Sequence, residues 1–321
     1  MLDRVLGLVS LVPFAIGSMA APAAAPSSVD FEFQDPAIVE SSGLVVQGGL
    51  FLTTNDSGDG GRVFVVDGTG RTVGTTSWEP EPEDVEALAP AEPGFVWVGD
   101  IGDNSAARES VTVLRVPYGR TAQEVEPASY TLVYPDHAHD AETLLAHPRT
   151  GQLFVVSKNV FGGTVYAAPR TLSESEPNRL REVADQVKGV ATDGSFFPDG
   201  RHYVLRDYVD ATVYTFPGHE PIDSFRLPAQ RQGEGIAVDE RDAVHVSTEG
   251  QFTQVRSVQL PPKLQAAMQP ERPEQPATTP PSEVEGAQAD EPVWPWLLLG
   301  AVGAGFVLLI LRKLTRHGAA S

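Results

Sequence analysis

Carboxylate and amide side chains gather in short polar segments of this chain, each placed directly before or after an apolar run. Carboxylate and carbonyl oxygens are the hard donors that Ca²⁺ prefers in proteins. Several like charges in one place also need a cation, a proton or a basic partner to be tolerated. With Ca²⁺ as the expected cofactor, the predicted metal ligands are Asp84, Glu86, Asp103, Asn104, Glu142 and Glu234.

Two basic side chains, Lys158 and Arg206, stand in segments of the same kind. They could neutralise neighbouring carboxylates or bind an anionic ligand. With two acids that follow similar apolar runs, they form a predicted ligand-binding group of Lys158, Arg206, Asp207 and Glu249. A second interpretation stays open for every one of these polar residues, because Asx side chains also stabilise turns by bonding to the local backbone.

Residues 55–61 and 99–104 are dense in Asp, Asn and Gly, a composition that suits cation-binding loops. Neither segment has the spacing of an EF-hand loop, which places a glutamate at its twelfth position. Turn formation alone explains both segments about as well.

The segment 137–140, His-Ala-His-Asp, invites a zinc interpretation, because histidines at i and i+2 of an extended chain point the same way. The hydrolase pattern that it resembles continues to an aspartate and a histidine. Here Ala141 and Glu142 occupy those places, and Glu142 matches an acidic residue of the preceding repeat unit. The mismatch disfavours zinc hydrolase chemistry.

The sequence lacks the motifs of several other kinds of chemistry. No Gly-x-Ser-x-Gly elbow, Walker loop or Rossmann fingerprint occurs, and the alternation of helices and strands that would hold them is missing. The chain has no cysteine, which excludes disulfides, a thiol nucleophile and a thiolate metal site. No catalytic residue can therefore be named.

The elements that must position these side chains repeat about every 48 residues, measured between the apolar residues Leu44 and Ile236. Each unit has the pattern of four short strands separated by turn residues, which is typical of a β-propeller blade. The fifth unit lacks a fourth strand, and residues 29–33 could supply it and close the ring. We predict an all-β fold, a β-propeller of five four-stranded blades closed by the N-terminal strand; a β-sandwich is the alternative.

In a propeller, the loops that precede the innermost strands and those that follow the second strands lie at one end of the central channel. The polar segments fall at these two positions. The sequence therefore predicts an oxygen-rich metal or ligand site at one mouth of the channel.

The ends of the chain indicate export and anchoring. Residues 1–23 have the basic, apolar and small-residue order of a signal peptide. Residues 293–311 carry no charge, begin with tryptophans and precede Arg312 and Lys313, as in a single transmembrane helix whose C-terminal tail, 312–321, is cytoplasmic. Between them, residues 29–262 form the predicted ectodomain and 263–292 a proline-rich stalk. The expected location is the cell membrane, crossed once.

The net charge of the chain limits the classes of partner that it is expected to bind. Asp and Glu number 43 against 23 Lys and Arg, giving a net charge of −20. Such an acidic surface argues against binding to nucleic acid or to anionic lipid. The expected partner is an extracellular ligand.

Residues 55–59, 99–104 and 233–237 resemble segments of exported, membrane-anchored β-propeller proteins of bacteria, and more distantly of phytase-like and gluconolactonase-like propellers. The resemblance covers roughly residues 29–262. It implies calcium bound by acidic and amide residues at the channel mouth, with Glu86, Glu142, Glu234, Asp103 and Asn104 as the matching positions.

Two functional hypotheses follow. The first is a cell-surface binding module for a protein, glycan or envelope ligand, stabilised by Ca²⁺. The alternative is a calcium-dependent hydrolase of an ester, lactone or phosphoester. The absence of a cluster of basic residues disfavours a phosphate-rich substrate.

Overall fold

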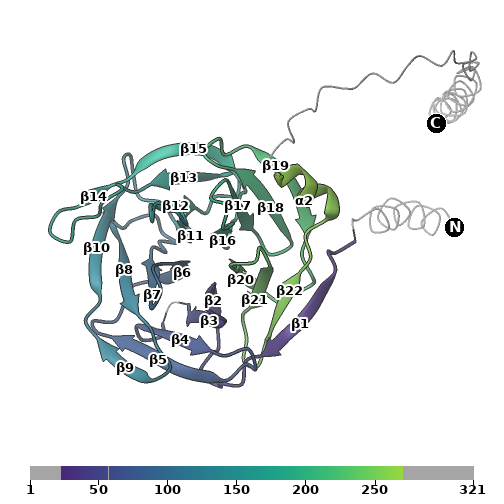
Figure 1. The fold of residues 1–321 in the computed structure, drawn as a ribbon. Helices are drawn as coiled ribbons and strands as arrows, with labels where there is room; N and C mark the ends of the chain where they lie inside the picture. Colours follow the sequence, from purple (N-terminus) through teal and green to yellow (C-terminus); the bar gives the residue numbers. More distant parts are fainter. Residues whose placement is uncertain (1–22, 57, 270–321) are drawn as a thin grey trace, which may run out of the picture. The chain divides into compact units, whose positions relative to one another are not determined.

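Five β-sheets stand around a central axis in the computed structural model, whose described residues are 23–56 and 58–269 (Figure 1). Each sheet places one strand next to the axis, and the innermost strands of neighbouring sheets contact one another around the ring. These innermost strands are β2 (Ser41–Gln47), β6 (Val85–Pro90), β11 (Ala141–Ala146), β16 (Asp193–Phe196) and β20 (Gly233–Val238). The predicted five-bladed propeller is confirmed.

The other strands follow outward in each blade by antiparallel pairing. The second strands are β3 (Leu50–Asn55), β7 (Phe95–Asp100), β12 (Leu153–Ser157), β17 (His202–Arg206) and β21 (Val244–Thr248). The third strands are β4 (Arg62–Val66), β8 (Val111–Pro117), β13 (Gly163–Ala167), β18 (Asp210–Thr215) and β22 (Gln254–Val258). The fourth strands are β5 (Thr72–Trp78), β10 (Ala128–Val133), β15 (Arg181–Val187), β19 (Pro221–Arg226) and, from the N-terminus, β1 (Ser27–Glu32).

The ring closes as the sequence predicts. β1 pairs with β22, from Ser27 opposite Val258 to Glu32 opposite Gln254, and so completes the fifth blade. The first and last parts of the propeller share one sheet, which removes an unpaired strand edge and ties the ends of the ring together.

Two blades carry a short fifth strand that the repeat does not predict. β9 (Ala122–Val125) pairs in parallel with β5, and β14 (Asn178–Arg179) pairs in parallel with β10. β14 lies one residue before β15, so this short stretch of chain contributes strands to two successive blades.

Five hydrophobic clusters fill the spaces between successive blades. Strands β3, β11 and β20 are buried along their whole length, because both faces of each blade pack against a neighbour. This packing holds the innermost strands, and therefore the side chains at their ends, in fixed positions.

The chain leaves the last blade through helix α2 (Pro262–Met268), which places Leu264 in the cluster between the fourth and fifth blades. Residues 263–268 were expected to begin an extended stalk. A helix forms there instead, because Pro262 suits the first turn of a helix and the helix allows Leu264 to be buried in this cluster. In residues 23–56 and 58–269, no helix has the length and apolarity needed to cross a membrane. The remaining stalk, the predicted helix at 293–311, the tail and the signal peptide up to residue 22 lie outside the described residues.

Candidate functional site

The predicted polar positions meet at one end of the channel. Residues that begin an innermost strand pair with residues that end the second strand of the same blade, as Ser41 does with Asn55 and Val85 with Asp100. We call this end the mouth face. Its loops comprise residues 33–40, 56–61 (with 57 not described), 79–84, 101–110, 134–140, 158–162, 188–192, 207–209, 227–232 and 249–253.

Three carboxylates from two blades form the centre of the mouth face. Asp56 follows β3, Asp84 precedes β6 and Glu86 is the second residue of β6, and one oxygen of each lies within 4.8 Å of the other two. Glu86 is only 7 % exposed. Burial, followed by repulsion from Asp56 and Glu142, raises the pKa of Glu86 to about 10. In the absence of a cation this carboxyl is therefore protonated at neutral pH.

A lysine occupies the neighbouring part of the mouth. Lys158, which follows β12, forms an ion pair with Glu142 at the start of β11. Burial raises the pKa of Glu142 to about 7 although Lys158 lowers it. One oxygen of Glu142, Oε2, is buried without a hydrogen-bond partner among the described residues.

The fifth blade contributes Glu234 and Glu249. Burial, with repulsion from Glu142 and Glu249, raises the pKa of Glu234 to about 8. Gln232 donates to Glu249 across 2.6 Å, and the two side chains line a small hollow beside the mouth. Three of the predicted metal ligands, Glu86, Glu142 and Glu234, are thus interacting buried acids at one mouth.

Asp103 and Asn104 are not members of this carboxylate cluster. Asp103 accepts hydrogen bonds from the amides of Ala107 and Arg108, at 3.0 and 2.8 Å, and so stabilises its own loop. Asn104 is exposed. Asp100, at the end of β7, forms an ion pair with Arg108 at 2.9 Å. The Asp/Asn-rich segment 99–104 mainly builds a turn, the second of the two interpretations that its composition allows.

Arg206 is fully buried and lies between the fourth and fifth blades. Its Nη1 donates to the carbonyls of Gly235 and Ser247 at 3.0 and 3.3 Å, and its Nε donates to the carbonyl of Asp207. Burial lowers the pKa of Arg206 to about 10, while Glu234 and Asp193 favour its charged form. Such a guanidinium braces the blades and is not accessible to a ligand.

Asp207 is also bonded within the protein. Its Oδ1 accepts from the amides of Val209 and Asp210, both at 2.7 Å, and its Oδ2 pairs with Lys188 at 2.8 Å. Asp207 therefore shapes the loop between β17 and β18. Of the predicted ligand-binding group, only Lys158 and Glu249 remain at the open part of the mouth.

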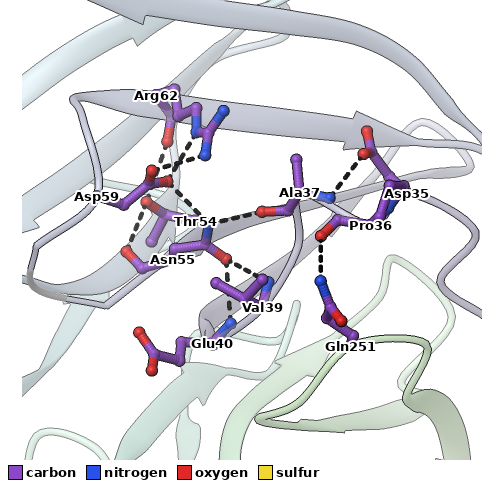
Figure 2. Close-up of polar contacts among 10 residues, drawn as sticks. All are labelled: Asp35, Pro36, Ala37, Val39, Glu40, Thr54, Asn55, Asp59, Arg62 and Gln251. Carbon is purple, nitrogen blue, oxygen red and sulfur yellow. Dashed lines mark hydrogen bonds and ion pairs between the residues drawn. The ribbon is translucent and has the colours of Figure 1, made fainter.

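Asn55 organises the segment that leads into β2 (Figure 2). Its Oδ1 accepts from the amides of Val39 and Glu40 at 3.0 and 3.2 Å, and its Nδ2 donates to the carbonyl of Ala37 and to Asp59. Asp59 in turn holds Arg62 in a two-bonded ion pair. Asn55 and Asp59 thus hold the chain on either side of Asp56.

A group of exposed hydrophobic side chains, which we call the hydrophobic rim, lies on the same face as the acidic centre. Among the described residues, every exposed large hydrophobic side chain except Val29 lies on the mouth face. Phe161 and Val160, in the loop after β12, are the most exposed, at 89 % and 77 %. The members of the hydrophobic rim are Val39, Val160, Phe161, Tyr208, Val209 and Phe252.

Two loops join the larger part of this rim. The amide of Val190 donates to the carbonyl of Asn159, and Lys188 in the same loop pairs with Asp207. Residues 158–162 and 207–209 are therefore held side by side through residues 188–190. The sequence analysis missed the rim, whose signal is an apolar pair directly after Asn159 and another after Asp207, at positions where a turn is normally polar.

A larger cavity, of about 630 Å³, lies at the opposite end of the channel and is lined by Trp97, Phe196 and several prolines. Its acidic side chains have partners: Glu92 pairs with Arg115, and Glu240 accepts from the amide of Gly48. The buried carboxylates with strongly raised pKa values lie at the mouth face. For this reason we place the functional site there.

No protein-family model matches the chain, and no curated protein matches it in sequence. Solved structures with similarity to it are a glutaminyl cyclase from Myxococcus xanthus (12 % identity, TM-score 0.47, 75 % of this chain and 100 % of that one), a streptogramin B lyase (9 %, 0.41, 74 % and 98 %) and a glucose dehydrogenase (10 %, 0.44, 74 % and 100 %). All three TM-scores are below 0.5, so these similarities add nothing to the fold that the chain's own strands show. The similarity does not extend to an activity.

Proposed function

We propose that the chain is an exported, membrane-anchored binding module that binds a protein ligand with its mouth face and holds Ca²⁺ at Asp56, Asp84 and Glu86. The observation that carries the proposal is the presence, on one face, of buried carboxylates together with the hydrophobic rim. Export and anchoring rest on the sequence of residues 1–23 and 293–311.

The donor set favours calcium over softer ions. Three carboxylates offer oxygen only, and Ca²⁺ takes six to eight oxygen ligands, so that water or a ligand would complete its coordination. The Glu86 carboxyl is buried and is repelled by Asp56 and Glu142, so a cation bound beside it would stabilise its charged form.

The hydrophobic rim favours a polypeptide as the ligand. Exposed aromatic and aliphatic side chains that gather on one face mark protein interaction sites, and aromatic residues supply much of the binding energy at such sites. Beyond the three calcium ligands, the mouth still presents the carboxylates of Asp140, Glu234 and Glu249. A ligand segment with apolar residues and at least one lysine or arginine complements both features.

Selection of a random peptide library on the immobilised full chain in the presence of Ca²⁺ tests this function. We expect enriched peptides to combine a basic residue with aromatic or aliphatic neighbours. The double variant Val160→Ser, Phe161→Ser should weaken their binding by at least about tenfold, because both side chains are exposed and would lose only intermolecular contacts. The control Val29→Ser changes an equally apolar, exposed residue on the outer strand β1 and should leave binding unchanged.

Three outcomes would contradict the proposal: enrichment of acidic peptides, no enrichment at all, or enriched peptides that bind the double variant as tightly as the native chain. Binding of neutral lipid vesicles through Phe161, with no selected peptide, would assign the rim to a membrane surface instead.

Gly102 provides a separate test of the calcium ligands. A Cβ at this position would lie 2.3 Å from Oδ2 of Asp84 and 2.8 Å from Cγ of Glu86. Gly102→Ala must therefore displace both carboxylates, and we expect calcium affinity, measured by competition with a fluorescent chelator, to fall about tenfold or more. Gly119→Ala, whose Cβ would meet nothing within 4 Å, is the matched control. If Gly102→Ala and Gly119→Ala bound calcium with equal affinity, Asp84 and Glu86 would not be calcium ligands.

Glu142 supports a second candidate function, the calcium-dependent hydrolysis of an ester or lactone. Its pKa of about 7 suits a general base, and Lys158 and Tyr208 stand beside it. A panel of simple esters and lactones with Ca²⁺ should then show turnover that Glu142→Gln abolishes while calcium binding is retained. The absence of turnover across the panel would favour the binding module.

A further inference from the structure

The loop between β10 and β11 brings two histidines and an aspartate together on the mouth face. Nδ1 of His137 lies 3.0 Å from Oδ2 of Asp136, and Nε2 of His139 lies 3.1 Å from each oxygen of the same carboxylate. One ligand atom from each of the three residues lies within 4.8 Å of the other two.

The surroundings of His139 Nε2 are crowded with oxygen. Besides the two carboxylate oxygens of Asp136, the hydroxyl of Tyr166 lies 2.8 Å from this nitrogen. An imidazole nitrogen has one proton or one lone pair, so it cannot form good hydrogen bonds with three oxygens at once. A cation at this position would bind the lone pair of the nitrogen and would also neutralise the charge of the carboxylate.

The spacing of the donor atoms suits a small transition-metal ion. Zinc binds nitrogen and carboxylate oxygen at about 2.0–2.2 Å in tetrahedral geometry, which separates its ligand atoms by about 3.3 Å. The separations of 3.0 and 3.1 Å differ from that value by amounts that small side-chain rotations can supply.

One of the histidines is held in place and the other is open to solvent. The buried rings of Tyr134 and Tyr166 lie 4.9 and 5.1 Å from the His139 ring, centroid to centroid, which fixes its orientation. The side chain of His137 is 72 % exposed, so an ion could enter from solvent and keep a position free for water or another ligand.

We propose that Asp136, His137 and His139 form a site for a divalent transition-metal ion such as Zn²⁺, bound by three protein ligands with a fourth position open. Two imidazoles and one carboxylate select borderline ions and disfavour Ca²⁺, which prefers oxygen alone. The third ligand precedes the histidines in the chain, whereas the hydrolase pattern places its further ligands after them. The site is independent of the calcium site and of the binding function proposed above.

The test uses the full chain after treatment with a chelator. Competition against a chromogenic zinc indicator should give one tight site per chain that a large excess of Ca²⁺ does not displace. Cobalt in place of zinc should produce the visible absorption of a four-coordinate ion. His137→Ala, which removes an exposed side chain and should not disturb the fold, is expected to weaken zinc binding by at least about a hundredfold.

Asp136→Asn should also weaken zinc binding, and it keeps the shape of the side chain. His219→Asn is the control, because His219 bonds to Tyr203 elsewhere in the propeller and should not contribute. The proposal would be overturned by zinc affinity that survives His137→Ala and Asp136→Asn, by equal loss in the His219 variant, or by displacement of zinc with Ca²⁺.

Discussion

Without calcium, the free energy of unfolding of the protein should fall as the pH rises from 5 to 8, and Glu86→Gln should remove most of that fall. Burial raises the pKa of Glu86 from an ordinary 4.5 to about 10 in the folded protein. Between these two values the native state keeps a proton that the unfolded chain releases. Folding stability therefore decreases with pH, by up to about 1.4 kcal/mol per pH unit for one such group.

The size of the effect can be bounded. Over this range Glu86 alone would contribute about 2–4 kcal/mol, and Glu142 and Glu234, whose pKa values are about 7 and 8, add smaller amounts in the same direction. Glutamine resembles the protonated carboxyl, so Glu86→Gln should be the more stable protein at pH 8. Calcium should restore the native chain at pH 8 and leave the variant unchanged.

Chemical denaturation of both proteins across this pH range, with and without chelator, measures the effect. Glu126→Gln, which changes an exposed glutamate just after the outer strand β9, should follow the native profile. A native profile that is flat, or a variant that is less stable than the native chain at pH 8, would show that Glu86 is not a buried protonated acid.

Arg206→Met is expected to destabilise the propeller by about 3–5 kcal/mol, because it removes one partner of a buried charged network. Asp193, fully buried, accepts hydrogen bonds from the amides of Gly194, Ile236 and Leu44, and the guanidinium offsets the charges of Asp193 and Glu234. The variant would leave these acids without a nearby cation, and the carbonyl of Gly235 would lose its bond from the guanidinium, while the carbonyl of Ser247 would keep only the bond from Gln230.

A loss of this size should lower the thermal midpoint by roughly 10 °C. Arg201→Met, at an exposed position beside the start of the same strand β17, is the matched control and should shift the midpoint little. The opposite pattern, with ligand binding lost and the midpoint preserved, would restore Arg206 to the ligand-binding role that the sequence suggests.

The strand order could be predicted from the sequence because each repeat unit shows its strands as apolar runs separated by turn residues. The strand expected at 29–33 has no partner of its own, and the fifth blade lacks one strand, so its position could be predicted as well. β9 and β14 could not. They are short parallel additions whose partners lie about 50 residues away in the chain, and nothing local specifies such pairing.

The candidate site divides in a similar way. Glu86, Glu142 and Glu234 occupy one position in three repeat units, so the ring geometry alone brings them to one mouth. Residue type alone could not distinguish Asp103 from these three glutamates. The loop amides that it binds become visible only in three dimensions, as does the burial of Arg206.

The central claim is that Ca²⁺ binds at the mouth by displacing the proton of Glu86. Calorimetric titration of the full chain with Ca²⁺ at pH 7.5, in two buffers of different ionisation enthalpy, tests it most directly. We predict saturable binding of about one ion per chain with the release of about one proton. An absence of binding, or binding without proton release, would contradict the account.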